Sequence, residues 1–159
     1  MTNGRVWIRW LLLGALTAGA LDITYAVLFH YFRSGVPPIR IFQSVASGAL
    51  GRAAYQGGIG TAGLGLGFHF LNALIITATF FAAAARLPFL TRRPVLWGVL
   101  YGIGVYAVMN YVVIPLSAIG HFPKFVPIIA ITGILVHMFF IGVPIAWAAK
   151  RVADQTARV

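Results

Sequence analysis

The chain has 159 residues, of which 60% are hydrophobic and 9% are charged, and its twelve Lys and Arg against two acids give a net charge of +10. A soluble domain carries about 25% charged residues, so this composition excludes an ordinary soluble protein and indicates a membrane protein. The length accommodates about four spans of roughly 20 residues in a single membrane domain covering 1–159. Cysteine is absent, which excludes disulfides, thiol catalysis and thiolate metal sites.

The first predicted element is a transmembrane helix over about 7–29. Arginines before it and a small-x-small pattern at Ala18–Ala20 resemble a signal peptide, but the apolar run continues to Phe29, so we expect an uncleaved helix. After Pro37-Pro38, apolar residues at helical spacing predict a short amphipathic helix over about 38–52. We expect it at the outer membrane interface, as a packed cap or as a gate.

A glycine-rich hinge then precedes the second predicted span, 61–85. The hinge lacks the Lys-Ser/Thr ending of a phosphate loop, which excludes nucleotide binding, and its glycines favour close helix packing. The third predicted span, 94–115, begins at Pro94 and stops near Pro115, and the fourth, 125–149, is kinked by Pro144. The expected fold class is an all-α four-transmembrane-helix bundle with one interfacial helix.

The distribution of basic residues predicts the orientation. With four spans, eight Lys and Arg lie on the side of the termini and the middle loop, including Arg158, and four lie on the opposite side. The basic side is expected to be cytoplasmic, so the chain should span the bacterial inner membrane with both termini in the cytoplasm. The four tryptophans fall at this interface: Trp7, Trp10, Trp97 and Trp147. The basic residues flank apolar runs, so the expected partner is the lipid bilayer, with a homo-oligomer or another membrane protein possible, and not nucleic acid.

Each predicted span carries polar residues on a stripe of small residues four apart, so these side chains should point into the bundle. At 1.5 Å per residue, Asp22, His69 and Asn110 lie about 8–12 Å below the outer end of their spans, and His137 about 18 Å. We therefore expect one cluster, formed by Asp22, His69, Asn110, Asn72 and His137. It is the candidate site for binding a ligand or a proton; no catalytic residue is assigned.

Asp22 is the most informative member, because a carboxylate at mid-span costs roughly 2.5–3.5 kcal/mol. It must be protonated, paired with His69 or reached by water. The asparagines and His137 have a simpler alternative, since such groups often only join helices by hydrogen bonds. Three tyrosines could belong to the core or to the wall of a pocket: Tyr25, Tyr101 and Tyr106. His30 and His121 are expected at the outer interface, where water solvates them.

Several chemistries are disfavoured. No HxxxH or ExxH pattern supports a metal site, and no GxSxG supports a serine hydrolase. We expect no cofactor; haem b is a minor alternative, because His69 and His137 are the only interior pair and differ in depth by about 6 Å.

Four motifs carry a family resemblance: GALDITYA around Asp22, IFQSVASGALG in the first loop, GLGFHF around His69 and YGIGVYAVMNYVVIPLS around Asn110. Over about residues 14–118 the chain resembles an uncharacterised bacterial family of small four-helix inner-membrane proteins. The family has no established activity, so the resemblance implies topology and not a function. Its motifs contain Asp22, His69 and Asn110 but not His137.

The expected function is binding or transport of a small molecule, proton or ion, with Asp22 as the ionisable centre, His69 as its partner, and Asn110 and Asn72 as orienting groups. One alternative is a structural or accessory membrane subunit. Another is an enzyme acting on a lipid or quinone, although the sequence inclines against an enzyme. Transport predicts an opening to Asp22, a subunit predicts an exposed face of small residues, and a lipid enzyme predicts a lateral cleft.

Overall fold

The computed structural model describes residues 4–157, and this part of the chain is helical with no strand. Arg158, which belongs to the predicted basic side, lies outside the described residues. Four helices are long and apolar enough to cross a membrane, which confirms the all-helical fold class with four candidate spans. They are α1 (Gly4–Ser34), α3 (Gly58–Arg86), the continuous helix Pro94–Leu116 and the continuous helix Pro127–Thr156.

Each helix overlaps a predicted span and extends beyond it at one or both ends. The first helix continues past Phe29 because no helix-breaking residue occurs before Gly35. Gly35 has a positive φ of 66°, and Pro37 and Pro38 follow it in the sequence. The expected glycine-rich hinge is not a hinge. Its residues from Gly58 onward are the first turns of α3, and only the start is marked by a positive φ, 57° at Gly58.

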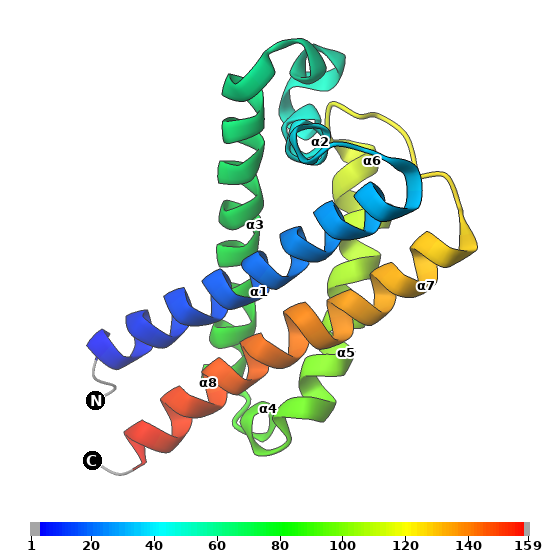
Figure 1. The fold of residues 1–159 in the computed structure, drawn as a ribbon. Helices are drawn as coiled ribbons and strands as arrows, with labels where there is room; N and C mark the ends of the chain where they lie inside the picture. The colour runs from blue at the N-terminus through cyan, green and yellow to red at the C-terminus, as the bar shows by residue number, and fades with distance from the viewer. Residues whose placement is uncertain (1–3, 158–159) are drawn as a thin grey trace.

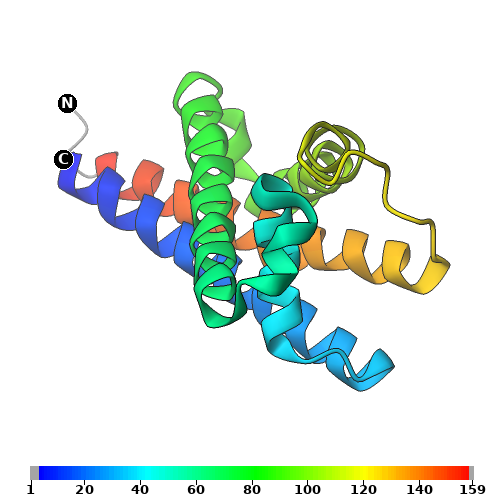
Figure 2. The same cartoon turned by 90° about the horizontal axis from the view of Figure 1, so that it is seen from above.

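The helices cross one another and are not aligned in parallel (Figures 1 and 2). The fourth helix comprises α7 (Pro127–Val136), a π-helical turn η3 (His137–Gly142) and α8 (Val143–Thr156). It runs antiparallel beside α1, and behind this pair lie α3 and α5 (Pro94–Val108). The main packing partners of α1 are α3 and α8, whereas α5 packs on η3 and α8.

Both ends of the described chain lie at one end of the bundle, together with the short helix α4 (Phe89–Arg92); we call this the terminal end (Figure 1). Its core is built mainly from alanines of α8 and large residues of α3, and it is closed by tryptophans that contact aromatic rings. Trp7 lies 5.7 Å from Phe81 and Trp97 lies 5.0 Å from Phe89, ring centroid to centroid.

The opposite end carries α2 (Pro38–Leu50), and we call it the cap end. This helix lies within the stretch 38–52 where a short amphipathic helix is predicted. Its face toward the bundle is fully packed, with Gln43, Ala46 and Ser47 at most 5% exposed. Gly65 of α3 is in contact with the carbonyl of Phe42, so a side chain larger than hydrogen would not fit there.

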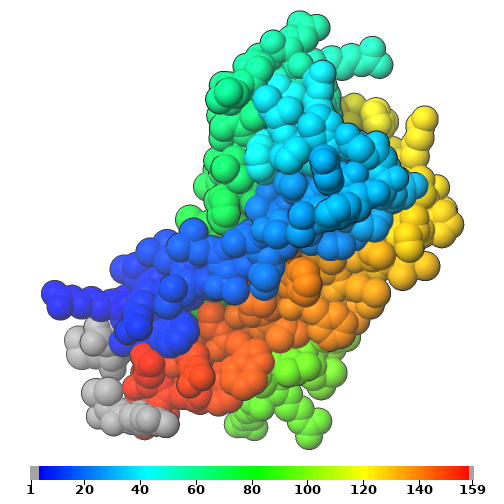
Figure 3. Space-filling view, viewed as in Figure 1, coloured from blue at the N-terminus to red at the C-terminus, as the bar shows by residue number. Residues whose placement is uncertain are grey.

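Hydrogen bonds fasten α2 on two sides. On one side the Gln43 Nε2 donates to the Gly58 carbonyl over 3.0 Å, next to the 3₁₀ segment η1 (Gly51–Gln56). On the other side the Ala118 amide donates to the Gly48 carbonyl over 2.8 Å. The space-filling view shows α2 seated over the end of α1 and against α3 (Figure 3). The helix is therefore a packed cap.

Two of the long helices contain a π-helical turn shortly before a proline. In the third helix the turn η2 (Met109–Val113) precedes Pro115 in α6 (Ile114–Leu116). In the fourth, η3 precedes Pro144. Proline has no amide hydrogen and its ring clashes with the carbonyl four residues earlier, and a locally wider turn relieves that clash. Neither helix is broken, so the expected stop near Pro115 is one residue short of the helix end.

Candidate functional site

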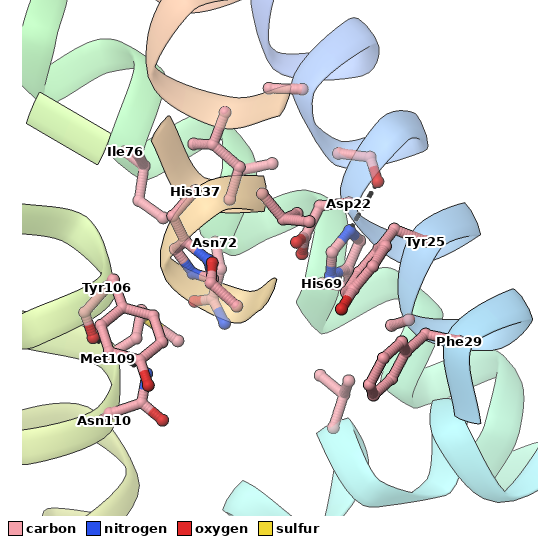
Figure 4. Close-up of a pocket in the computed structure, with 18 of the residues that line it drawn as sticks. Asp22, Tyr25, Phe29, His69, Asn72, Ile76, Tyr106, Met109, Asn110 and His137 are labelled. Atoms are coloured by element: carbon pink, nitrogen blue, oxygen red, sulfur yellow. Dashed lines mark hydrogen bonds between the residues drawn. The ribbon is translucent and has the colours of Figure 1, made fainter. Parts of the chain in front are cut away.

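A cavity of about 370 Å³ lies between the four long helices beneath α2. All the residues of the predicted polar cluster line it, so the structure brings together side chains from four separate helices (Figure 4): Asp22 of α1, His69 and Asn72 of α3, Asn110 of η2 and His137 of η3. The remaining lining is largely apolar, with Val45 contributed by the cap α2. The cavity therefore has the composition of a ligand site: mostly apolar, with a few polar groups converging on it.

Asp22 is partly buried on the inner face of α1, one turn before Tyr25. Its carboxylate makes no hydrogen bond and no ion pair with any described residue; the one ion pair found in residues 4–157 joins Lys150 to Asp154. The expected direct pairing of Asp22 with His69 is thus not formed. An acceptor that no protein group satisfies remains available to a ligand, a proton or water.

His69 makes a different contact, which has a local cause. Its Nε2 lies 2.8 Å from the Gly19 carbonyl oxygen, one turn before Asp22. Gly19 permits this approach, because a Cβ there would lie 2.9 Å from the Phe70 ring and 3.2 Å from the Ala73 Cβ. Since a carbonyl only accepts, Nε2 carries the proton, and Nδ1 of the neutral ring is left as an acceptor.

Tyr25, which the sequence left open as a core or pocket-wall residue, lines the cavity. Its ring stacks on Phe29, with centroids 5.2 Å apart, and both residues line the cavity. The Tyr25 hydroxyl is the buried side-chain group of residues 4–157 that has no hydrogen-bond partner. Buried polar groups are satisfied in the great majority of cases, so this hydroxyl at the cavity wall is free to donate to a water or a ligand in the cavity. The only sequence signal was its position three residues after Asp22.

On the far side of the cavity lie Tyr106 and Asn110, with His137 and Asn72 between the two sides in the view of Figure 4. The Asn110 Nδ2 donates to the Tyr106 carbonyl over 2.9 Å, which leaves its amide oxygen free. The His137 Nδ1 lies 2.9 Å from the Gly133 carbonyl, so Nε2 of the neutral ring is a free acceptor. The Tyr106 ring meets the His137 ring edge-on at 5.3 Å.

The histidine contacts also bear on haem. Each ring donates to a backbone carbonyl of its surroundings, and ligation of iron through the Nε2 of His69 would require breaking its bond to Gly19. Within residues 4–157 no group of three or more His, Asp or Glu side chains lies close enough to hold a metal ion. His137, in contrast, keeps its Nε2 free, so the minor haem alternative stays a prediction.

The other residues singled out from sequence fall into different settings. Tyr101 belongs to the core, since its hydroxyl donates to the Ile76 carbonyl over 2.6 Å and its ring packs on Phe80. His30 lines the cavity near the cap end, whereas His121 is exposed. Comparison of the chain with models of protein families, with curated proteins and with solved structures finds no match.

Proposed function

We propose that this chain is an integral inner-membrane protein that binds a small molecule or ion in the central cavity, as a transporter-type protein does, with Asp22 as the ionisable centre. The observation that carries this proposal is the convergence of five polar residues from four helices on one cavity. Polar side chains that only joined helices would be expected to bond to one another. Here the carboxylate of Asp22 and the hydroxyl of Tyr25 have no hydrogen-bond or ion-pair partner within residues 4–157.

In the proposed site each group has a distinct role. Asp22 supplies negative charge or accepts a proton, and the Tyr25 hydroxyl donates to the ligand. Asn110, from the opposite wall, and Asn72, from between the two sides, orient it by hydrogen bonds. His69 offers Nδ1 as an acceptor next to Asp22, and His137 offers Nε2, since the other nitrogen of each ring is held by a carbonyl. In binding sites the polar side chains are typically held in place by further hydrogen bonds, here to backbone carbonyls.

The test is native mass spectrometry of the full-length protein released from membranes. Wild type is expected to retain a small molecule, and Asp22→Asn is expected to lose it. The unfolding temperature of Asp22→Asn should be equal to or higher than that of wild type, which shows that the variant is folded. Asp154→Asn is the matched control, because Asp154 is the other acid of the chain and lies in α8, away from the cavity. If wild type and Asp22→Asn carry the same bound species, or neither carries one, the cavity is structural.

The proposed orientation has both termini in the cytoplasm, as the excess of basic residues at the terminal end favours. The chain contains no cysteine, so single cysteines report position cleanly. Arg92→Cys in α4 should react with a membrane-impermeant maleimide only from the cytoplasmic side, and Arg52→Cys in η1 only from the periplasmic side. Both positions are exposed. Labelling of both from one side would end the four-span arrangement.

An accessory subunit is a second candidate, favoured by one observation. Gly60, Gly63 and Gly67 of α3 are exposed, and a Cβ at each would meet nothing within 4 Å. Such a face admits close approach of another helix. Gly63→Cys would form an intermolecular disulfide in membranes if this face pairs with a second copy, whereas Ile103→Cys on the exposed side of α5 would not. Crosslinking together with an empty cavity would favour the subunit.

A further inference from the structure

The lining of the central cavity contains an acidic side chain but no lysine or arginine. Asp22 is its one acidic side chain. The polar groups left free are mostly acceptors: the Asp22 carboxylate, the Nδ1 of neutral His69, the amide oxygen of Asn110 and the Nε2 of neutral His137. An anion would meet no lysine or arginine here. A cation would gain from the carboxylate in a region of low dielectric constant.

Aromatic rings reinforce this preference. Tyr25, Phe29 and Tyr106 line the cavity together with the imidazoles, and Asp22 lies one turn from Tyr25 on α1. A ring face attracts a cation, most strongly when the cation is desolvated. Apolar and aromatic walls with one carboxylate fit an organic cation better than a hydrated metal ion, which would need several oxygen ligands at once.

A second hollow adjoins the first. It has a volume of about 480 Å³, lies between α3 and α5, and shares Asn72, Ile76 and Met109 with the central cavity. Its outer wall includes Ile75, Leu100 and Val108, which are about half exposed, so the groove opens on the lateral surface of the bundle. Apart from Asn72, Thr79 and Tyr101, its lining is apolar.

Three side chains that line both hollows form the boundary between them: Asn72, Ile76 and Met109. Met109 is the first residue of the π-helical turn η2, and a methionine side chain is flexible. The helices α3 and α5 are joined by the hydrogen bond from the Tyr101 hydroxyl to the Ile76 carbonyl. The Phe80 and Tyr101 rings also meet edge-on at 4.9 Å, and the two helix backbones otherwise make few close approaches. A molecule dissolved in the bilayer would therefore reach Asp22 by displacing Met109 and the side chain of Ile76.

We propose that the ligand of the central cavity is a lipophilic organic cation that enters laterally from the bilayer, between α3 and α5, and places its charge beside Asp22. This proposal rests on the proposed binding function and adds the chemical class and the route. The lateral groove holds the apolar part of the molecule, and the central cavity holds the charged part.

Charge preference is tested with two probes of the same shape and opposite charge, tetraphenylphosphonium and tetraphenylborate, added to the full chain in nanodiscs of neutral lipid. Empty nanodiscs give the partitioning baseline. Wild type and Asp154→Asn should bind the cation at least about tenfold more tightly than Asp22→Asn does. The anion should bind none of the three above baseline. Equal binding of both probes by wild type, or unchanged cation binding by Asp22→Asn, overturns the proposal.

The route is tested with two glycines that both have open space around the Cβ position. Gly104 lines the groove, and Gly67 lies on α3 outside both hollows. Gly104→Phe should slow association of tetraphenylphosphonium by about tenfold, because a ring would fill the groove, while Gly67→Phe leaves the rate unchanged. Equal rates for the two variants would exclude lateral access.

Failure of this proposal is distinguishable from failure of the proposed function. If natively purified wild type retains a neutral or anionic molecule that Asp22→Asn loses, the cavity binds a ligand and the cation assignment is wrong. If no molecule is retained and the cation does not bind, both proposals fall.

Discussion

The terminal end and the cap end of this bundle use the same four helices in opposite ways. At the terminal end the helices touch through glycine and alanine, and the core has no polar group without a partner among the described side chains. At the cap end the helices diverge, large polar side chains face one another across a cavity, and α2 closes the top. Close packing at one end stabilises the bundle, which allows the other end to keep polar groups without partners.

The largest effect should come from filling a helix contact at the edge between the two regions. A Cβ on Gly102 would contact the His137 carbonyl and lie 2.6 Å from the Met138 Cα. Gly102→Leu should therefore lower the free energy of unfolding by about 3 kcal/mol. Gly104→Leu, two residues away with nothing near its Cβ position, is the control. Thermal unfolding in detergent measures both; equal transition temperatures would contradict the observed α5–η3 contact.

Deleting one tyrosine hydroxyl at each end sharpens the comparison. Tyr101→Phe removes the bond to the Ile76 carbonyl and should cost about 1 kcal/mol. Tyr25→Phe removes a hydroxyl without a partner and should leave stability equal or slightly higher, while weakening ligand binding. The measurement is chemical or thermal unfolding of both variants without ligand. A larger loss for Tyr25→Phe would mean that its hydroxyl is bonded within the protein.

The carboxylate of Asp22 should oppose folding, because it is partly buried with no partner. Asp22→Asn keeps the shape and removes the charge, so it should raise the free energy of unfolding by about 1 kcal/mol at neutral pH. The gain is measured by unfolding in detergent without added ligand. A loss of stability would indicate that the charge is compensated in the folded protein.

The smallest effect is expected at the far terminal end. Asp154 pairs with Lys150 four residues earlier, with the Lys Nζ 2.6 Å from a carboxylate oxygen and both side chains partly exposed. Asp154→Asn should cost about 0.3–0.5 kcal/mol, and added salt should abolish the difference. Unfolding at low and high ionic strength checks this. A salt-independent loss would point to a contact other than this ion pair.

The sequence predicted the elements well because the signals are local. Apolar runs bounded by Pro and Arg mark the four long helices, and small residues four apart mark the packed faces, so the meeting of Asp22, His69 and Asn110 at one cavity followed from periodicity and depth. The glycine-rich stretch before the second span was misread as a hinge, because glycine weakens a helix on average but tertiary contacts, here between Gly65 and α2, override that tendency.

The partners of the polar groups could not be predicted in the same way. Which atom His69 contacts depends on how closely α3 approaches Gly19. Sequence spacing does not give that separation to within tenths of an ångström. Tyr25 carried no signal beyond its position three residues after Asp22, since a tyrosine in an apolar run is equally consistent with a core residue. The π-helical turns at η2 and η3 were hidden as well, although a proline two residues after each turn was visible.

The π-helical turn at Met109–Val113 also determines where this chain can change length during evolution. A π turn holds one residue more than an α turn, so residues beyond it are rotated as though one residue had been inserted. Deleting one residue there would restore the α-helical ladder and keep the flanking segments in register, at the cost of returning Pro115 to a clash with the carbonyl four residues earlier. Deleting one elsewhere in a long helix would rotate everything beyond it by about 100° and turn packed faces outward. By helical register alone, loss of a single codon is thus best placed at the two π turns, and each such loss would reshape the cavity that their residues line.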